Sequence, residues 1–287
     1  LIVGDALGVP VEFFSRKQLV EDPVLNMSEF GTYHQPAGTW SDDSTMMLIT
    51  LEVLLAQYDL TEMMKGFDQW LTHAYMTPHS EVFDVGETTR LAIYNYKSGE
   101  PFENWGLQDV RSNGNGSLMR MLPLSLFVAN EPVSEIIKKT FDVSALTHAH
   151  DRSKLCCGYF SLLIKALLNE YTLIDAMEYA TTEIASFVSR DEYEHLERIL
   201  SGAIINEPVD NVNSSGYVIS TLEASLWCCH NSSSFSEAVL KAVNLGDDSD
   251  TTGAVTGALA GLMYPTDSRR DEWVSQLTKC DMIKSLI

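Results

Sequence analysis

Three aspartates stand at positions 247, 248 and 250, directly before an apolar run from Ala254 to Tyr264. A polar residue before such a run marks the start of a helix, but only one side chain can occupy the N-cap position. The helix dipole stabilises each nearby anion by only about 0.3–1 kcal/mol, so it cannot hold three carboxylates by itself. Either this helix start is solvated or it binds a cation.

A second acidic helix start lies far away in the chain, where Ser41, Asp42 and Asp43 precede another apolar segment. If the two starts converge, four or five carboxylates meet the hydroxyls of Ser41 and Thr251. An all-oxygen set of this kind suits a hard divalent ion such as Mg²⁺, Mn²⁺ or Ca²⁺ better than zinc. Two ions bridged by the carboxylates would balance the negative charge better than one.

Two familiar metal sites do not fit the sequence. An EF-hand loop beginning at Asp248 would need a bidentate glutamate at its twelfth position, where this chain has Leu259. The histidines of Thr147–His150 are followed by Cys156 and Cys157, but their spacing matches no standard zinc pattern. We interpret these histidines and cysteines as packing residues of a helical segment.

The glycine- and asparagine-rich segment 113–116 precedes a helix that we expect over residues 117–129. Backbone N–H groups at such a helix start form a site for an anion, for example a diphosphate. The segment lacks the Gly-Lys-Ser/Thr of a P-loop and no strand precedes it, which excludes a nucleoside triphosphatase of that class. A simple turn followed by a helix cap explains the same residues equally well.

Two further acidic positions have both a structural and a functional interpretation. Glu12 follows Pro10 in a predicted loop, and it is an ordinary surface acid unless it faces the cation cluster. Asp84 opens the segment 84–89, which resembles a helix start and is explained either by capping or by a role in the site.

The elements that must position these groups are predicted to be helices. Apolar residues recur at helical spacing around residues 63–74, 155–166 and 235–243, and further helices are expected at 87–97, 133–141, 173–186, 190–201 and 216–229. The sequence therefore predicts an all-α protein, a single compact bundle of about ten or more helices that forms one domain over residues 1–287. The helix after Asp250 should be central, buried and open to a cavity at its acidic end.

Three glycines lie on one face of that predicted central helix, at positions 253, 257 and 261. Glycine costs about 1 kcal/mol relative to alanine inside a helix. We therefore expect a backbone or a ligand to press against this face.

Composition narrows the functional classes. The formal net charge of −21 argues against unaided binding to nucleic acid or to an anionic membrane. No apolar run is long enough to span a bilayer. The five cysteines do not resemble a disulfide framework, so we expect reduced thiols and a cytoplasmic protein. Because the chain begins at Leu1 in helix-like sequence, we expect that N-terminal residues are missing.

Taken together and in this order, these segments resemble the ADP-ribosylglycohydrolase family. The similarity runs nearly the whole length of the chain and rests on seven blocks. They are GDALGVPVE at 4–12, GTWSDDST at 38–45, DVGETT at 84–89, GNGSLMR at 114–120, TH at 147–148, GYVISTLEASLW at 216–227 and NLGDDSDTTGAVTGALAG at 244–261.

The resemblance implies an all-α fold with two divalent cations, Mg²⁺ or Mn²⁺, that hydrolyses the glycosidic bond at the distal ribose of ADP-ribose. Its substrate would be an ADP-ribosylated protein, with ADP-ribose as the product. The implied metal ligands are Ser41, Asp42, Asp43, Asp248, Asp250 and Thr251. The implied substrate-binding residues are Gly114, Asn115, Gly116, Ser117 and His148.

For the chemistry, we expect a water to attack the anomeric carbon with the help of a carboxylate, either Glu12, Asp42 or Asp43. Two positions depart from the family pattern. Ser41 stands where threonine is frequent, and Asp247 replaces the second glycine of a Gly-Gly-Asp sequence. A non-catalytic module that binds ADP-ribose is the competing interpretation, and the acceptor, which we expect to be arginine, could be another group.

Overall fold

The computed structural model describes residues 1–286, which are almost wholly helical. The described part contains 15 α-helices joined by short loops and six 3₁₀ turns. The helices are α1 Ile2–Gly8, α2 Arg16–Glu21, α3 Asp42–Ala56, α4 Leu60–His73, α5 Glu87–Lys97, α6 Leu122–Phe127, α7 Val133–Ala145, α8 Asp151–Leu168, α9 Leu173–Ile184, α10 Arg190–Leu200, α11 Val218–His230, α12 Phe235–Val243, α13 Ser249–Met263, α14 Ser268–Gln276 and α15 Cys280–Leu286.

The predicted all-α fold is therefore confirmed, and most predicted helices lie within a few residues of the observed ones. The helix expected over 117–129 is the exception, since α6 begins only at Leu122. Residues 117–121 instead form turns, in which the backbone N–H groups of Leu118 and Met119 both donate to Asn115 O. Pro123 stands in the first turn of α6, where its missing N–H is tolerated.

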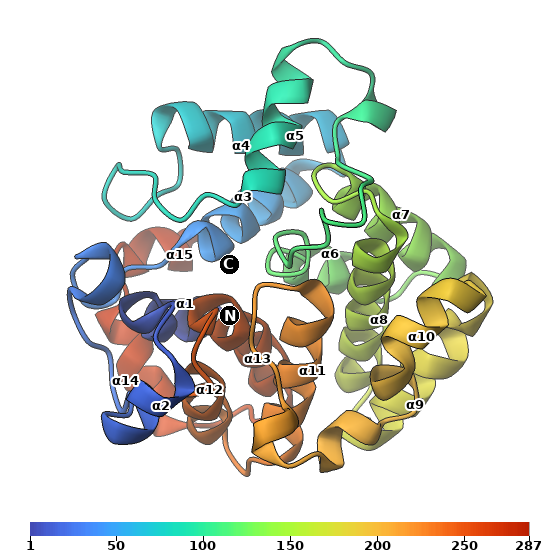
Figure 1. Ribbon diagram of the computed structural model, residues 1–287. Helices are drawn as coiled ribbons and strands as arrows, with labels where there is room; N and C mark the ends of the chain where they lie inside the picture. Colours follow the sequence, from blue (N-terminus) through green and yellow to red (C-terminus); the bar gives the residue numbers. More distant parts are fainter. Residues whose placement is uncertain (287) are drawn as a thin grey trace.

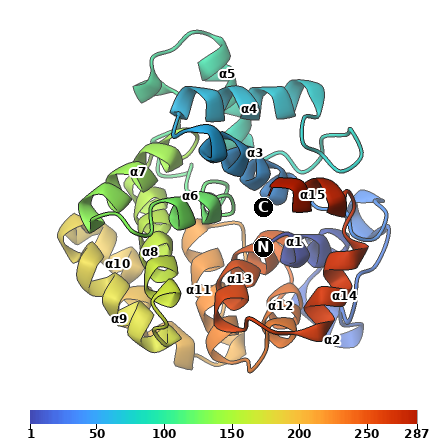
Figure 2. The same cartoon turned by 180° about the vertical axis from the view of Figure 1, so that it is seen from behind.

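Helix α13 lies at the centre of the fold, as predicted from its apolar sequence. It packs against α1, α3, α8, α11 and α12, and its residues from Ser249 to Ala260 are buried. Figure 1 shows α1, α3, α11 and α12 gathered around α13, and the view from behind in Figure 2 agrees. This packing draws together segments from both ends of the sequence.

Two further groups of helices flank this centre. Helix α8 packs against α6, α7, α9 and α11 and is the central helix of one side of the molecule. Helix α4 packs on α3, and α5 packs on α4, so that these three form the top of the view in Figure 1. No extended strand occurs among residues 1–286, where only isolated bridges such as Gly114–Tyr217 are formed.

The glycines of α13 meet the expectation only in part. A Cβ atom built on Gly253 would lie 2.5 Å from Gly4 O, so the backbone of α1 does press against this position. Gly257 has ordinary contacts with the Leu1 backbone, and the prediction is wrong for Gly261, which has nothing within 4 Å. The close approach of α1 is therefore confined to the acidic end of α13.

None of the helices in the described part combines the length and the apolar character that crossing a membrane requires. All five cysteines are free thiols, and four of them are buried.

Candidate active site

The two acidic helix starts, whose convergence was the condition for a shared cation site, do meet. Asp43 in the first turn of α3 accepts hydrogen bonds at one oxygen from Ser41 Oγ at 3.0 Å and from Thr251 Oγ1 at 3.2 Å. Ser41 is the N-cap of α3, whereas Thr251 lies in the first turn of α13. The hydrogen bond from Thr251 links the two helix starts through residues that are 208 positions apart in the chain.

The carboxylates form two groups at this junction. Glu12, Asp84 and Asp250 each offer an oxygen within 4.8 Å of the others, and so do Asp42, Asp43 and Asp84. Oxygen ligands of one hard cation lie about 2.0–2.6 Å from it and therefore no more than about 5 Å from each other. Each group thus has the dimensions of a site for one ion, and Asp84 belongs to both groups.

Burial makes this arrangement costly without a cation. Burial, reinforced by the charges of Asp84 and Asp248, raises the pKa of Glu12 to about 9. Burial followed by neighbouring carboxylates also raises the pKa of Asp42, Asp43 and Asp250 well above the usual range. In the protein alone these groups favour the protonated form, and a bound cation would favour the ionised form.

Three buried carboxylate oxygens at the junction also lack a hydrogen-bond partner among residues 1–286. They are Glu12 Oε2, Asp43 Oδ1 and Asp250 Oδ2, and each belongs to one of the two groups. Unpaired buried acceptors are rare in folded proteins, because they lose the interaction with water and gain nothing. Together with the oxygen-only donor set, they fit Mg²⁺ or Mn²⁺.

Asp84 is a member of this site that we predicted only as one of two alternatives. The helix that follows begins at Glu87 after Gly86, which makes no side-chain cap, so Asp84 does not cap it. Its backbone has a positive φ of 53°, a conformation that aspartate tolerates better than most residues. Tyr33 is a further neighbour that no sequence signal indicated, since burial followed by the charges of Asp84 and Glu12 raises the pKa of its hydroxyl.

Asp5 is a second residue that the sequence analysis did not assign to the site. It lies on α1, fully buried, and its carboxylate accepts hydrogen bonds from the backbone N–H groups of Ser41 at 2.9 Å and Ser44 at 3.0 Å. One helix therefore supplies the anion that occupies the N-terminus of another. The only sequence signal was a polar residue between Gly4 and Gly8, which both face α13 closely.

Asp248 and Asp247 take different positions from Asp250. Asp248 lies outside both carboxylate groups, and its Oδ2 accepts a hydrogen bond from Asn115 Nδ2 at 2.8 Å. Asp247 is exposed and has a positive φ of 57°, which explains why glycine suits this position. Its backbone pairs with Phe13 and Phe14, which fixes the loop that carries Glu12.

A cavity of about 270 Å³ opens directly above the carboxylates. The glycine-rich segment forms one wall, where Asn115 N donates to Gly216 O at 3.0 Å. The cavity is lined by Glu12, Phe13, Asp42, Asp84, Gly86, Glu87, Thr88, Thr89, Gly114, Asn115, Gly116, Met119, His148, Gly216, Asp248 and Thr251. The structure thus brings most of the sequence-predicted site residues to one place.

Ser117 is placed differently from the other predicted substrate-binding residues. Its side chain is fully buried between Cys157 Sγ at 3.3 Å and Ser144 Oγ at 3.0 Å, and it does not line the cavity. The glycine-rich segment also does not open a helix at this residue, so the expected helix-dipole contribution to anion binding is absent there. Any anion would rely on the backbone N–H groups of Gly114 and Gly116, because that of Asn115 donates to Gly216 O.

His148 lines the cavity beside that segment. A Cβ atom built on Gly116 would lie 2.8 Å from His148 Cε1, so only glycine fits against the ring. Burial, together with the nearby charge of Arg120, lowers the pKa of His148 to about 3. The imidazole is therefore neutral at physiological pH.

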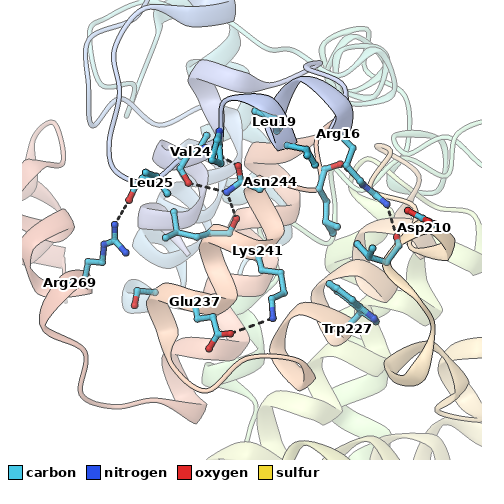
Figure 3. Close-up of a pocket in the computed structure, with 16 residues that line it drawn as sticks. Arg16, Leu19, Val24, Leu25, Asp210, Trp227, Glu237, Lys241, Asn244 and Arg269 are labelled. Carbon is cyan, nitrogen blue, oxygen red and sulfur yellow. Dashed lines mark hydrogen bonds and ion pairs between the residues drawn. The ribbon is translucent and has the colours of Figure 1, made fainter.

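A larger cavity, about 840 Å³, lies on another face between α2, α11 and α12. Figure 3 shows that several of its polar side chains form hydrogen bonds or ion pairs within the protein itself. Asn244 pairs with the backbone of Val24 through both amide atoms, and Arg16 donates to the carbonyl groups of Val209 and Val212. This mostly apolar groove offers no group of carboxylates and no chemistry of the kind seen at the smaller cavity.

Comparison with known proteins agrees with this geometry. The family model described as ADP-ribosylglycohydrolase matches residues 1–287. The ADP-ribosylarginine hydrolase Tri1 of Pseudomonas putida is 30% identical over 293 residues, covering 100% of this chain and 74% of that protein. The ADP-ribosyl-[dinitrogen reductase] glycohydrolase of Rhodospirillum rubrum is 27% identical, covering 96% of this chain and 87% of that protein.

Among solved structures, one described as an ADP-ribosylglycohydrolase-related protein complex has a TM-score of 0.82 and 28% sequence identity. The superposition covers 99% of this chain and 92% of that chain.

Proposed function

Because the chain belongs to the ADP-ribosylglycohydrolase family, we propose that it hydrolyses the bond between the distal ribose of ADP-ribose and an arginine side chain of a modified protein. The observation that carries this proposal is the pair of carboxylate groups that share Asp84 on the floor of a cavity. The choice of arginine is supported by the relatives that are named ADP-ribosylarginine hydrolases.

We further propose that the two groups hold two divalent cations, Mg²⁺ or Mn²⁺. Such ions would bind the vicinal hydroxyls of the ribose and polarise the sugar. Glu12, Asp84 and Asp250 would hold one ion, and the first turn of α3 would contribute Asp42 and Asp43 to the other. Ser41 and Thr251 would orient Asp43 through the hydrogen bonds described above.

The remaining residues of the cavity would position the substrate. The backbone of Gly114 and Gly116 would face the diphosphate, since glycine lets the chain approach a ligand closely. His148, which lies against this segment and also lines the cavity, would contact the same part of the ligand. Asp248 holds the side chain of Asn115, so we assign it a role in shaping this wall.

Hydrolysis needs a water at the anomeric carbon and a group that takes its proton. The water oxygen forms the new bond to the anomeric carbon, the bond to the guanidine nitrogen breaks, and that nitrogen accepts a proton. Glu12 is our choice for the proton acceptor, because it lines the cavity and its Oε2 is free of protein partners within residues 1–286. Asp42, which also lines the cavity, is the alternative.

The direct test measures release of free ADP-ribose from ADP-ribosyl-arginine and ADP-ribosyl-serine peptides, with Mg²⁺, Mn²⁺ or EDTA present. We expect metal-dependent release from the arginine peptide alone. Release from the serine peptide alone would contradict the proposed acceptor. Binding of ADP-ribose without release from either peptide would indicate a binding module and contradict the proposed hydrolysis.

A further inference from the structure

A buried arginine, Arg120, connects the glycine-rich segment to the residue that precedes His148. Arg120 is fully buried and forms no ion pair with a carboxylate within residues 1–286. Its Nη1 donates to Gly116 O at 2.9 Å, its Nη2 donates to Thr147 Oγ1 at 2.8 Å, and its guanidinium lies 4.7 Å from the centre of the Phe67 ring. Burying a charged group without an ionic partner is unfavourable, so the position of Arg120 indicates a specific role.

The hydroxyl of Thr147 links Arg120 to His148 through hydrogen bonds. Thr147 Oγ1 lies 2.7 Å from His148 Nδ1. A guanidinium can only donate, so Thr147 accepts from Arg120 and has its own O–H available for Nδ1. If Nδ1 carried a proton instead, two donors would converge on one oxygen and the hydroxyl hydrogen would need another acceptor. The hydrogen bonds are all satisfied when Nδ1 is the acceptor.

The opposite edge of the ring faces the glycine-rich wall. A Cβ atom built on Gly114 would lie 3.5 Å from His148 Nε2, and one built on Gly116 would lie 3.4 Å from it. Both glycines and His148 line the cavity. A neutral imidazole with an acceptor at Nδ1 carries its proton at Nε2.

We propose that Arg120 and Thr147 are positioning residues that hold His148 in the neutral tautomer protonated at Nε2, so that the ring donates a hydrogen bond to an anionic oxygen of the ligand beside Gly114 and Gly116. The identity of that oxygen as part of ADP-ribose rests on the proposed function. The low pKa of His148 supports the neutral form, because burial and the Arg120 charge both oppose protonation.

A fixed donor matters in this cavity because carboxylates surround it. Glu12, Asp42, Asp84 and Asp248 all line the cavity, and ionised carboxylates only accept hydrogen bonds. Phosphate and ribose oxygens of a bound ligand therefore need hydrogen-bond donors from the side of the cavity formed by the glycine-rich segment and His148. The Nε2–H of His148 would add a side-chain donor to the backbone N–H groups there, and would do so without attracting a carboxylate as a charged imidazolium would.

The tautomer can be observed directly. We would label the protein with ¹⁵N-histidine and record long-range ¹H–¹⁵N correlations at pH 7, assigning His148 among the seven histidines by its loss in His148→Gln. We expect wild type to show a protonated Nε2 and an unprotonated Nδ1. An imidazolium or an Nδ1–H tautomer in the wild-type spectrum would overturn the proposal, whatever the variants do.

The role of Thr147 is tested with a matched pair of variants. Thr147→Val keeps the shape but removes the hydroxyl, whereas Thr147→Ser keeps the hydroxyl. We expect Thr147→Val to give a mixture of tautomers and to bind ADP-ribose about tenfold more weakly by calorimetry, the value of one hydrogen bond to a charged group. Thr147→Ser should restore the Nε2–H signal and bind within about twofold of wild type.

An unchanged tautomer and unchanged ADP-ribose affinity in Thr147→Val would contradict the positioning role. Failure of the proposed function gives a different result, because wild type would then release no ADP-ribose from the peptides while its spectrum still reports the tautomer. The two hypotheses are therefore separated by the same preparations of protein.

Discussion

At the scale of single residues, the site depends on carboxylates that differ sharply in what they contact. Asp84 belongs to both carboxylate groups, whereas Asp247 is exposed although it stands beside Asp248 in the sequence. The contrast between the two positions allows the proposed cation sites to be tested with one conservative substitution in each.

We predict that Asp84→Asn lowers the rate of ADP-ribose release by about a hundredfold or more, because one oxygen of the shared ligand is replaced by an amide nitrogen. Asp247→Asn is the control, and it should retain the wild-type rate within about twofold, since asparagine tolerates the positive φ at this position. Rates would be measured with the arginine peptide at saturating Mg²⁺. Equal losses in both variants would argue against a special role of Asp84.

His148 gives a prediction for the pH dependence of stability. Its pKa is about 3 in the folded protein, below the value of 6.5 for an unperturbed histidine, so only the unfolded chain takes up this proton near pH 5. Stability is therefore lost as the pH falls through about 6.5 towards the folded pKa. The buried carboxylates have raised pKa values, so their contribution to stability changes with pH in the opposite direction. A control variant that keeps these carboxylates is therefore needed to isolate the effect of His148.

We expect wild type to lose about 2 kcal/mol more than His148→Gln between about pH 7 and pH 5, because the glutamine variant has the same carboxylates but no imidazole. Urea unfolding of both proteins at the two pH values measures this difference. An identical pH dependence would show that the imidazole of His148 is not held neutral by the fold.

At the scale of elements, the contact between α1 and α13 positions the carboxylates. Gly4 and Gly253 allow the two backbones to touch, and Asp5 then reaches the N-terminus of α3. Gly261 lies in the same helix as Gly253 but has no neighbour within 4 Å. The two glycines of α13 therefore separate the effect of the close contact from that of helix propensity.

We predict that Gly253→Ala destabilises the protein by about 3 kcal/mol, because the new Cβ atom would overlap the backbone of α1. Gly261→Ala should instead raise stability by about 0.5–1 kcal/mol, since it removes only the helix cost of glycine. The free energies of unfolding in urea measure both changes. A small effect of Gly253→Ala would show that α1 can move away from α13 at little cost.

The sequence was sufficient to predict the helices and the two acidic helix starts, because both depend on local patterns. It was not sufficient for Asp5, whose role arises only when α1 packs against the start of α3. Asp84 was ambiguous because its conformation, with φ at 53°, has no reliable local signal. The expected helix start at Ser117 was wrong, since α6 begins at Leu122, and in the turns before it Gly116 O accepts from the buried side chain of Arg120.

At the scale of the whole molecule, the buried carboxylates oppose folding because their negative charges are close together and removed from water. The formal net charge is −21, and several carboxylates are buried at a single point. Each bound cation would therefore stabilise the folded chain directly, beyond any role in the reaction. We propose that residues 1–287 act as one domain in this respect.

We predict that Mg²⁺ or Mn²⁺ raises the melting temperature measured after EDTA treatment. At a hundredfold excess over the dissociation constant, one site contributes about 2.7 kcal/mol of stability, which corresponds to several degrees for a protein of this size. Asp84→Asn should greatly reduce the shift, and Asp247→Asn should leave it intact. A shift of equal size in all three proteins would place the cations elsewhere on the acidic surface.

The hydrogen bond between Thr251 and Asp43 spans 208 positions of the chain, and it has a consequence for the protein during its synthesis. A ribosome must translate through α13 before the second half of the acidic centre exists at all. Until then Asp43 lacks the hydrogen bond from Thr251, and contacts this distant in sequence form late. The proposed cation site that includes Asp250 would therefore form only after α13 has begun to emerge, whereas Asp42, Asp43 and Asp84 of the other group would all have emerged long before.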